Sequence, residues 1–87
     1  METNSKSYAV IFSYSFDNDV AVYLFDTYEE AFKFMKDNYE EELRIDTEEN
    51  NLDSYGIIEK DEGWAKIYTR RHNVIDITTF QIGDVYE

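Results

Sequence analysis

The segment TYEEAFKFMKDNYEEELR, residues 27–44, decides the fold class because it carries the helical repeat of apolar residues in this chain. Thr27 followed by Glu30 fits a capping box, in which each side chain satisfies a backbone N–H of the first turn. Apolar residues recur every three or four positions, which gathers them on one side of a helix: Tyr28, Ala31, Phe32, Met35, Tyr39 and Leu43. The sequence therefore predicts a helix over residues 28–44. Phe34 lies off this stripe, so it either widens the buried face or contacts another element.

Two strands are predicted before the helix. Residues 7–16, SYAVIFSYSF, alternate with a period of two and are rich in aromatic and β-branched residues, which is typical of a strand. Residues 17–19, DND, have the composition of a turn. Residues 20–25, VAVYLF, then form a second strand that is apolar on both faces, and the two strands are expected to pair as an antiparallel hairpin.

Three more strands are predicted after the helix. Residues 46–54, DTEENNLDS, are polar and aperiodic, so we expect a loop there. The strands that follow are SYGIIEK (54–60), WAKIYTR (64–70) and VIDITTFQI (74–82), separated by turns at 61–63 and 71–73. The predicted order is ββαβββ.

This order predicts an α+β fold of one domain over residues 1–87, with residues 1–6 disordered. One helix can cover one face of a sheet, so the expected architecture is a two-layer sandwich with a five-stranded, mostly antiparallel sheet. The connection through the helix can join two parallel strands, and it should then be right-handed.

The second face of the sheet has no helix to cover it. The strands at 7–16, 20–25 and 74–82 carry apolar residues on both faces, so the uncovered face needs its own aromatic rings, the loop or another protein as a shield. A second copy of the chain is the simplest candidate. We therefore expect a non-enzymatic protein-interaction module that self-associates as a homodimer through an exposed sheet face.

One strand face combines aromatic and basic residues: Trp64, Lys66, Tyr68 and Arg70. Proteins that bind single-stranded nucleic acids use such a pattern for base stacking and backbone contact. The net charge of the whole chain opposes that use here. We expect this stripe to bind an acidic peptide or a second subunit, or Trp64 to pack in the core.

The chain is strongly acidic, with 20 Asp and Glu against 8 Lys and Arg and a net charge of −12. This charge disfavours direct binding to nucleic acid or to an anionic membrane and favours a basic protein partner. The alternative function is therefore an acidic inhibitor of the phage or mobile-element type, which mimics nucleic acid and occupies a basic groove. Its candidate surface is Glu40, Glu41, Asp46, Glu48, Glu49, Asp53, Asp61 and Glu62.

The helix alone is a poor imitation of DNA. Residues 28–44 carry a net charge of −3 over about 25 Å, a length in which DNA carries about 15 phosphates. Glu29 and Lys33, and likewise Glu40 and Arg44, are spaced to form ion pairs along a solvated face. Any mimicry would need the acids of other segments to gather around the helix.

No pattern for catalysis, metal or cofactor binding is present. The chain lacks Cys, and its single histidine, His72, lies in a predicted turn without a nucleophile motif. A calcium loop starting at Asp46 fails because Asn51 replaces the required Gly and Ile57 the required Glu. The segment METNSKS is not a signal peptide and no apolar run could span a membrane, so a cytoplasmic protein is expected.

Overall fold

The computed structural model describes residues 8–15 and 17–85. The disorder predicted for residues 1–6 and the strand positions predicted for Ser7 and Phe16 lie outside this part of the chain. The described residues form the predicted ββαβββ order, with a short π-helical turn, η1, after the helix. The elements are β1 (Tyr8–Tyr14), β2 (Asp17–Phe25), α1 (Tyr28–Arg44), η1 (Ile45–Glu49), β3 (Asp53–Glu59), β4 (Trp64–Arg71) and β5 (Val74–Asp84).

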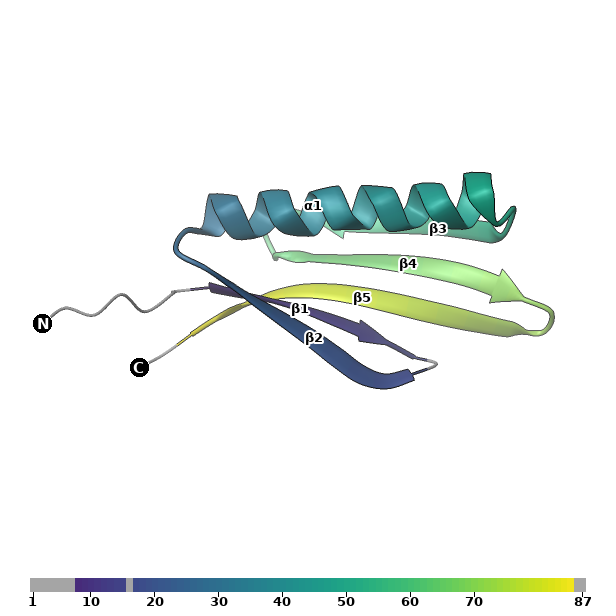
Figure 1. The fold of residues 1–87 in the computed structure, drawn as a ribbon, viewed down its shortest axis with the longest axis horizontal. Coiled ribbons are helices and arrows are strands. Elements are labelled where there is room, and N and C mark those ends of the chain that lie inside the picture. The colour runs from purple at the N-terminus through teal and green to yellow at the C-terminus, as the bar shows by residue number, and fades with distance from the viewer. Residues whose placement is uncertain (1–7, 16, 86–87) are drawn as a thin grey trace, which may run out of the picture.

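The strands form one five-stranded sheet in the spatial order β2-β1-β5-β4-β3, and every neighbouring pair is antiparallel. Four antiparallel steps separate the edge strands β2 and β3, so these two run in the same direction. The helix α1 connects them and lies against one face of the sheet, which confirms the α+β sandwich (Figure 1). The strands joined by the helix are thus parallel but not adjacent, because β1, β5 and β4 lie between them.

The helix has the predicted bounds, because the signals at its start and along its length are local. The Thr27 hydroxyl accepts a hydrogen bond from the Glu30 N–H at 3.1 Å, as in a capping box. The buried residues of the apolar stripe are Ala31, Met35 and Tyr39. Phe34 widens the buried face, since its ring centroid lies 4.9 Å from that of Tyr23 and 5.0 Å from that of Phe25 on β2.

The helical path continues past Arg44 into η1, so the loop predicted at residues 46–54 is wrong in part. The Thr47 hydroxyl donates to the carbonyl of Leu43 at 2.9 Å, and the N–H of Asn50 donates to the carbonyl of Ile45 at 2.9 Å. The chain then reverses at Asn51, whose φ of 54° is left-handed, and β3 begins at Asp53. A polar segment without periodicity gave no local sign of this turn.

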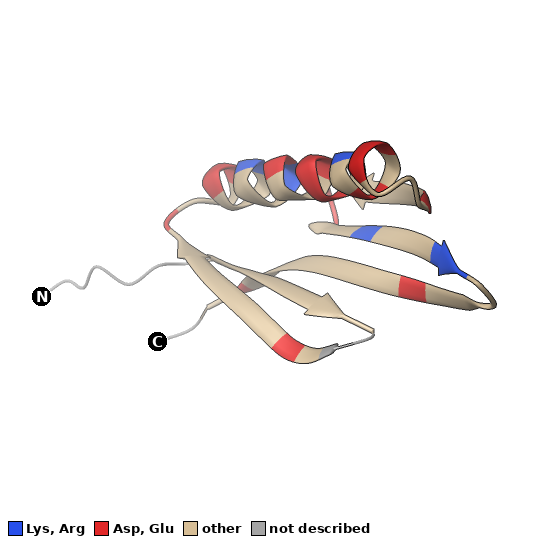
Figure 2. Ribbon diagram, turned by 45° about the vertical axis from the view of Figure 1, so that its right-hand side comes forward, with Lys and Arg blue, Asp and Glu red and all other residues tan. Residues whose placement is uncertain are grey.

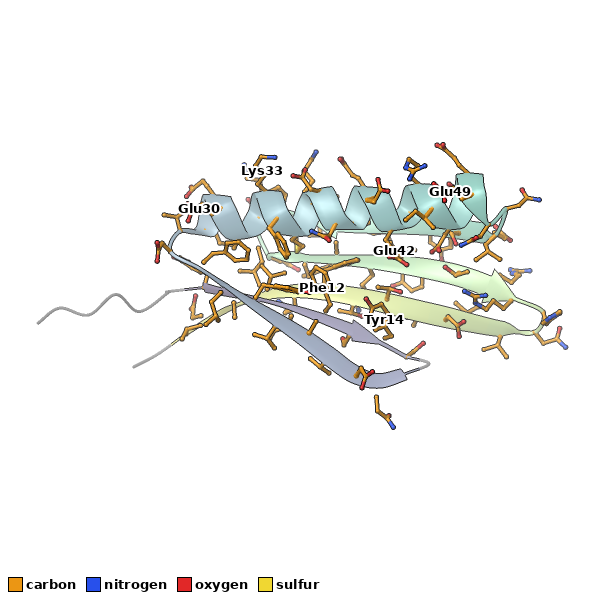
Figure 3. The ribbon with its side chains drawn as sticks, in the orientation of Figure 1. Phe12, Tyr14, Glu30, Lys33, Glu42 and Glu49 are labelled. Carbon is orange, nitrogen blue, oxygen red and sulfur yellow. The ribbon has the colours of Figure 1, made fainter. Side chains whose placement is uncertain are left out.

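The hydrophobic core lies between α1 and the sheet. Phe12 of β1 lies in its centre (Figure 3). The Phe12 ring meets that of Phe80 on β5 edge-on, with centroids 4.8 Å apart, and stacks near that of Phe34 at 5.8 Å. The core residues are Val10, Phe12, Ala31, Met35, Tyr39, Ala65, Ile67, Phe80 and Ile82. Burial of such aromatic and branched side chains removes apolar area from water, and this stabilises the fold.

Two turns differ in detail from the sequence prediction. Residues 17–19 begin β2 instead of forming a separate turn, and the register between β1 and β2 shifts between Ser13 and Tyr14. The extra residues are taken up by this irregularity in the ladder. At the other hairpin Arg71 pairs with Val74, so the turn is shorter than predicted and contains His72, with a φ of 55°.

Candidate interaction surface

The sheet has one face turned away from α1, which we call the open face. Because side chains alternate along each strand and the strand register is known, its members follow directly. They are Ala9, Ile11, Ser13, Val20, Val22, Leu24, Asp53, Tyr55, Ile57, Glu59, Trp64, Lys66, Tyr68, Arg70, Ile75, Ile77, Thr79, Gln81 and Gly83. The apolar surplus predicted for the uncovered face is therefore present among the described residues.

Large apolar side chains of the open face are exposed, most of them on the two edge strands of the sheet. The exposed fractions range from 43% to 59% for six of them: Val20, Val22, Leu24, Tyr55, Ile57 and Ile75. The first three lie on the edge strand β2, the next two on the edge strand β3, and Ile75 on β5. An isolated exposed apolar residue is ordinary, whereas several on one side of a sheet indicate a surface that contacts another molecule.

The four residues predicted as a sheet-face site all belong to the open face and follow one another along β4. Lys66 Nζ lies 5.5 Å from the centroid of the Trp64 ring, and the Trp64 indole N–H donates to Glu62 at 2.8 Å. Tyr68 stacks on Tyr55 of β3, with ring centroids 5.1 Å apart. These contacts fix the positions of the aromatic rings, and the rings form an apolar surface on the open face.

The open face is hollowed where β3, β4 and β5 approach the His72 turn. A depression of about 200 Å³ is lined by Asp53, Tyr55, Tyr68, Arg70 and Ile75. Arg70 Nε lies 3.9 Å from Asp53 Oδ2, which is too long for a hydrogen bond. The two charged ends therefore remain able to turn toward another molecule, while the tyrosines and the isoleucine supply apolar contact.

The open face carries no net charge, in contrast to the rest of the molecule. Its charged residues are the acids Asp53 and Glu59 and the bases Lys66 and Arg70. The whole chain has a net charge of −12. Among the described residues, the excess of carboxylates therefore lies away from this face, most of it on α1, on η1 and in the turns.

The acidic residues predicted as one interaction surface fall in separate places. Asp46 is 7% exposed, so it belongs to the interior and not to a surface; its carboxylate accepts a hydrogen bond from Thr69 at 3.4 Å. Asp53 lies on the open face. Glu40, Glu41, Glu48 and Glu49 lie at the C-terminal end of α1 and in η1.

The remaining two acids, Asp61 and Glu62, lie in the turn between β3 and β4. This turn meets the start of the helix, since the Tyr28 hydroxyl donates to the carbonyl of Lys60. The predicted acidic set is thus divided between the two ends of α1. A helix of 17 residues separates those ends by about 25 Å.

On the outer face of α1, acids alternate with bases along the helix (Figure 2). Lys33 pairs with Asp37 at 2.7 Å and Lys36 with Glu40 at 2.8 Å. The predicted pair of Glu29 with Lys33 is therefore wrong, although the spacing of four residues is right. Each lysine reaches an acid in the following turn.

Arg44 also has other partners than predicted. It binds Glu41 through two N–H donors, at 3.2 and 2.7 Å, and reaches Glu49 of η1 at 2.9 Å. The predicted pair with Glu40 is wrong because the two-donor geometry with Glu41 is the stronger arrangement. This hydrogen bonding lowers the pKa of Glu41 and raises that of Arg44.

One carboxylate of the helix points toward the strands. The Glu42 side chain lies on the sheet side of α1, whereas Glu30, Lys33 and Glu49 point away from the sheet (Figure 3). Burial raises the pKa of Glu42, and the nearby Asp46 carboxylate raises it further. Burial likewise raises the pKa of Tyr28 and Tyr39 on the same helix. These shifts concern packing under the helix and lie away from the open face.

The described residues contain no group of three or more His, Cys, Asp or Glu side chains placed to hold a metal ion. Within the same part of the chain, no helix is long and apolar enough to cross a bilayer. Comparisons of the chain with protein-family models, with curated proteins and with solved structures found no match. The fold and surface define a class no finer than a small acidic α+β protein with one bare sheet face.

Sequence reasoning located four residues of the open face and missed the rest. Tyr55, Ile57 and Ile75 also belong to it, as do the outer side chains of β2. The period of two in each strand divides its residues into two alternating sets, one for each face. Which of the two sets faces the helix depends on the strand order. That order depends on pairing between distant parts of the chain.

Proposed function

We propose that this protein is a non-enzymatic interaction module that self-associates through the open face. The observation that carries the proposal is the set of large apolar side chains, 43% to 59% exposed, on a sheet face that α1 does not cover. Transfer of apolar surface out of water is the main favourable term in most protein–protein association. A face with aromatic, aliphatic and a few charged residues has the composition of a protein interface.

A second copy is favoured as the partner by the distribution of charge. Two molecules with a net charge of −12 repel each other over most of their surfaces. The open face is neutral, so two copies can bring these faces together with the smallest repulsion. In a two-fold arrangement, Lys66 and Arg70 of one copy can approach Asp53 and Glu59 of the other.

Two sheets that meet in this way pack at about 10 Å and at a small angle set by their twist. The product would be a four-layer dimer with the helices outside and both open faces in the middle. The common interior would then contain the open-face apolar residues of the two edge strands, together with the aromatic pair of Tyr55 and Tyr68. This arrangement would bury the apolar residues that are exposed in the single chain.

Sedimentation velocity of two matched variants tests the proposal. Ile75 on the open face and Val74 on the helix side of the same strand are 54% and 59% exposed. Ile75→Lys should shift the protein from dimer to monomer, because a buried unpaired ammonium is costly, whereas Val74→Lys should remain dimeric. Equal sedimentation of the two variants and the unmodified chain would reject the open face as the interface.

A further inference from the structure

The outer edge of β2 has features that the open-face proposal does not use. An edge strand presents unpaired backbone groups, and proteins commonly protect it with lysine, proline or a short length. β2 runs over nine residues, and its segment VAVYLF, residues 20–25, has no charged residue and no proline. Its side chains on the open face are Val20, Val22 and Leu24, each more than half exposed.

The direction of the backbone groups in β2 follows from two hydrogen bonds elsewhere in the sheet. The N–H of Ile82 donates to the carbonyl of Gly63 at 2.7 Å, so Ile82 directs its backbone groups toward β4. Backbone groups in an antiparallel sheet alternate between the two neighbouring strands. Gln81 therefore faces β1, and its partner Ile11 faces β5. The bond from the N–H of Ser15 to the carbonyl of Ile77, at 2.9 Å, agrees with this assignment.

The same alternation carries across β1 to the edge. Phe12, next to Ile11, must direct its backbone groups toward β2, where its partner is Ala21. Ala21 and every second residue from it therefore face β1. The backbone N–H and C=O groups of the residues between them point outward: Val20, Val22 and Leu24. The residues that expose their backbone at the edge are thus the same ones that expose apolar side chains on the open face.

The opposite edge, β3, is protected. By the same alternation, the backbone groups that point outward belong to Ser54, Gly56 and Ile58. These three residues lie on the face of the sheet that α1 covers. The ring of Tyr39 from α1 lies directly over Gly56. The edge of β2 is therefore the better acceptor of the two.

We propose that the edge of β2 binds an extended segment of another protein, which adds to the sheet as a sixth strand beside it. The uncharged apolar segment at residues 20–25 favours a guest with β-branched or apolar residues in its centre. The net charge of −12 favours a guest with lysine or arginine at its ends and disfavours a second acidic copy. Face-to-face association through the open face leaves this edge free, so the two proposals stand independently.

Binding of a synthetic peptide, KKVTVTVKK, tests the proposal by fluorescence anisotropy. Val22→Pro removes an outward N–H while keeping an apolar side chain, and it should weaken binding at least about tenfold. The matched variant Val22→Thr keeps the N–H and the shape of the side chain, and it should change affinity less than about threefold. Binding should also weaken as salt increases, and the peptide EEVTVTVEE should bind more weakly.

Amide hydrogen exchange locates the peptide. Saturating KKVTVTVKK should slow exchange at Val20, Val22 and Leu24 and leave Ala21 and Tyr23 unchanged. Unchanged exchange at the first three residues, or equal binding by Val22→Pro, would overturn the proposal, as would the absence of binding at about millimolar peptide. Slow exchange there in concentrated protein without peptide would overturn it in favour of pairing between two β2 strands. Ile75→Lys should bind the peptide normally, which separates this result from loss of the dimer.

Discussion

Gly56 of β3 lies directly under the ring of Tyr39 from α1, and the contact leaves no space for a side chain. A Cβ atom at Gly56 would lie 2.6 Å from Cε1 and 2.8 Å from Cζ of Tyr39. Tyr39 is only 8% exposed, so its ring has little room to move. The glycine therefore sets how closely the helix approaches the edge strand β3.

Gly56→Ala should destabilise the fold by about 1–3 kcal/mol, because overpacking a filled site forces rings and backbone to shift. Chemical denaturation measures this change. Gly83 provides a matched control, since a Cβ there would have no atom within 4 Å. Gly83→Ala should change stability by less than about 0.5 kcal/mol. Equal losses in the two variants would show that strand geometry, and not the Tyr39 contact, determines the cost.

Asp46 should contribute to stability through its buried contacts. Its carboxylate accepts from Thr69 at 3.4 Å, and its backbone carbonyl accepts from the N–H of Leu52 at 2.7 Å. Asp46→Ala removes the side-chain bond, and it should cost about 1–2 kcal/mol in denaturant unfolding. The exposed Glu48 in the same turn is the control, and Glu48→Ala should be nearly neutral. A neutral Asp46→Ala would contradict a structural role for η1.

Glu42 should give the fold a measurable pH dependence. Burial and then the Asp46 carboxylate raise its folded pKa above the ordinary value of 4.5, so the folded state favours the protonated form. The contribution of Glu42 to stability is therefore greatest below pH 4.5, and it falls as the pH rises through the folded pKa. Glu42→Gln should raise Tm at neutral pH, and this gain should shrink in acid.

The neighbouring residue Glu41 should behave in the opposite way. Arg44 lowers its pKa through a hydrogen bond, so its contribution is present above the ordinary value of 4.5 and is lost as pH falls. Glu41→Gln should therefore lower Tm at neutral pH. Thermal unfolding of both variants across pH checks the pair, and a shift of the same sign in both would contradict the placement of Glu42 under the helix.

His72 adopts a left-handed backbone conformation, with a φ of 55°, in the turn between β4 and β5. Glycine adopts this conformation without the steric cost that a Cβ incurs. His72→Gly should therefore stabilise the fold by up to about 1 kcal/mol. Asn73, the next turn residue, is not among the described residues with positive φ, and Asn73→Gly should destabilise. Thermal unfolding that showed the reverse order would contradict this turn geometry.

The parts of the fold that were predicted correctly depend on local signals. The helix bounds Tyr28 and Arg44 followed from a cap and an apolar stripe that lie within the helix itself. The η1 turn was missed because its segment is polar and aperiodic, and because the partner of its buried Asp46 is Thr69, a residue 23 positions away. The place of β5 in the sheet was not predicted either, since the pairing of Tyr8 with Asp84 joins the two ends of the chain.

The candidate site was predicted in the same uneven way. The alternation of Trp64, Lys66, Tyr68 and Arg70 placed these residues on one face without knowledge of the fold. Charge along the sequence, in contrast, did not show where the acids lie in space. Asp46 turns inward, and the acids at residues 61–62 lie at the other end of the helix from those at 40–41 and 48–49.

The central claim, that the open face joins two copies of the chain, is tested most directly by sedimentation equilibrium of the unmodified protein. The experiment covers protein concentrations from about 1 μM to about 1 mM at low and moderate salt. We expect a monomer–dimer equilibrium that shifts toward the dimer as salt screens the repulsion between two acidic molecules. A single monomeric species over the whole range, at both salt concentrations, would contradict the claim.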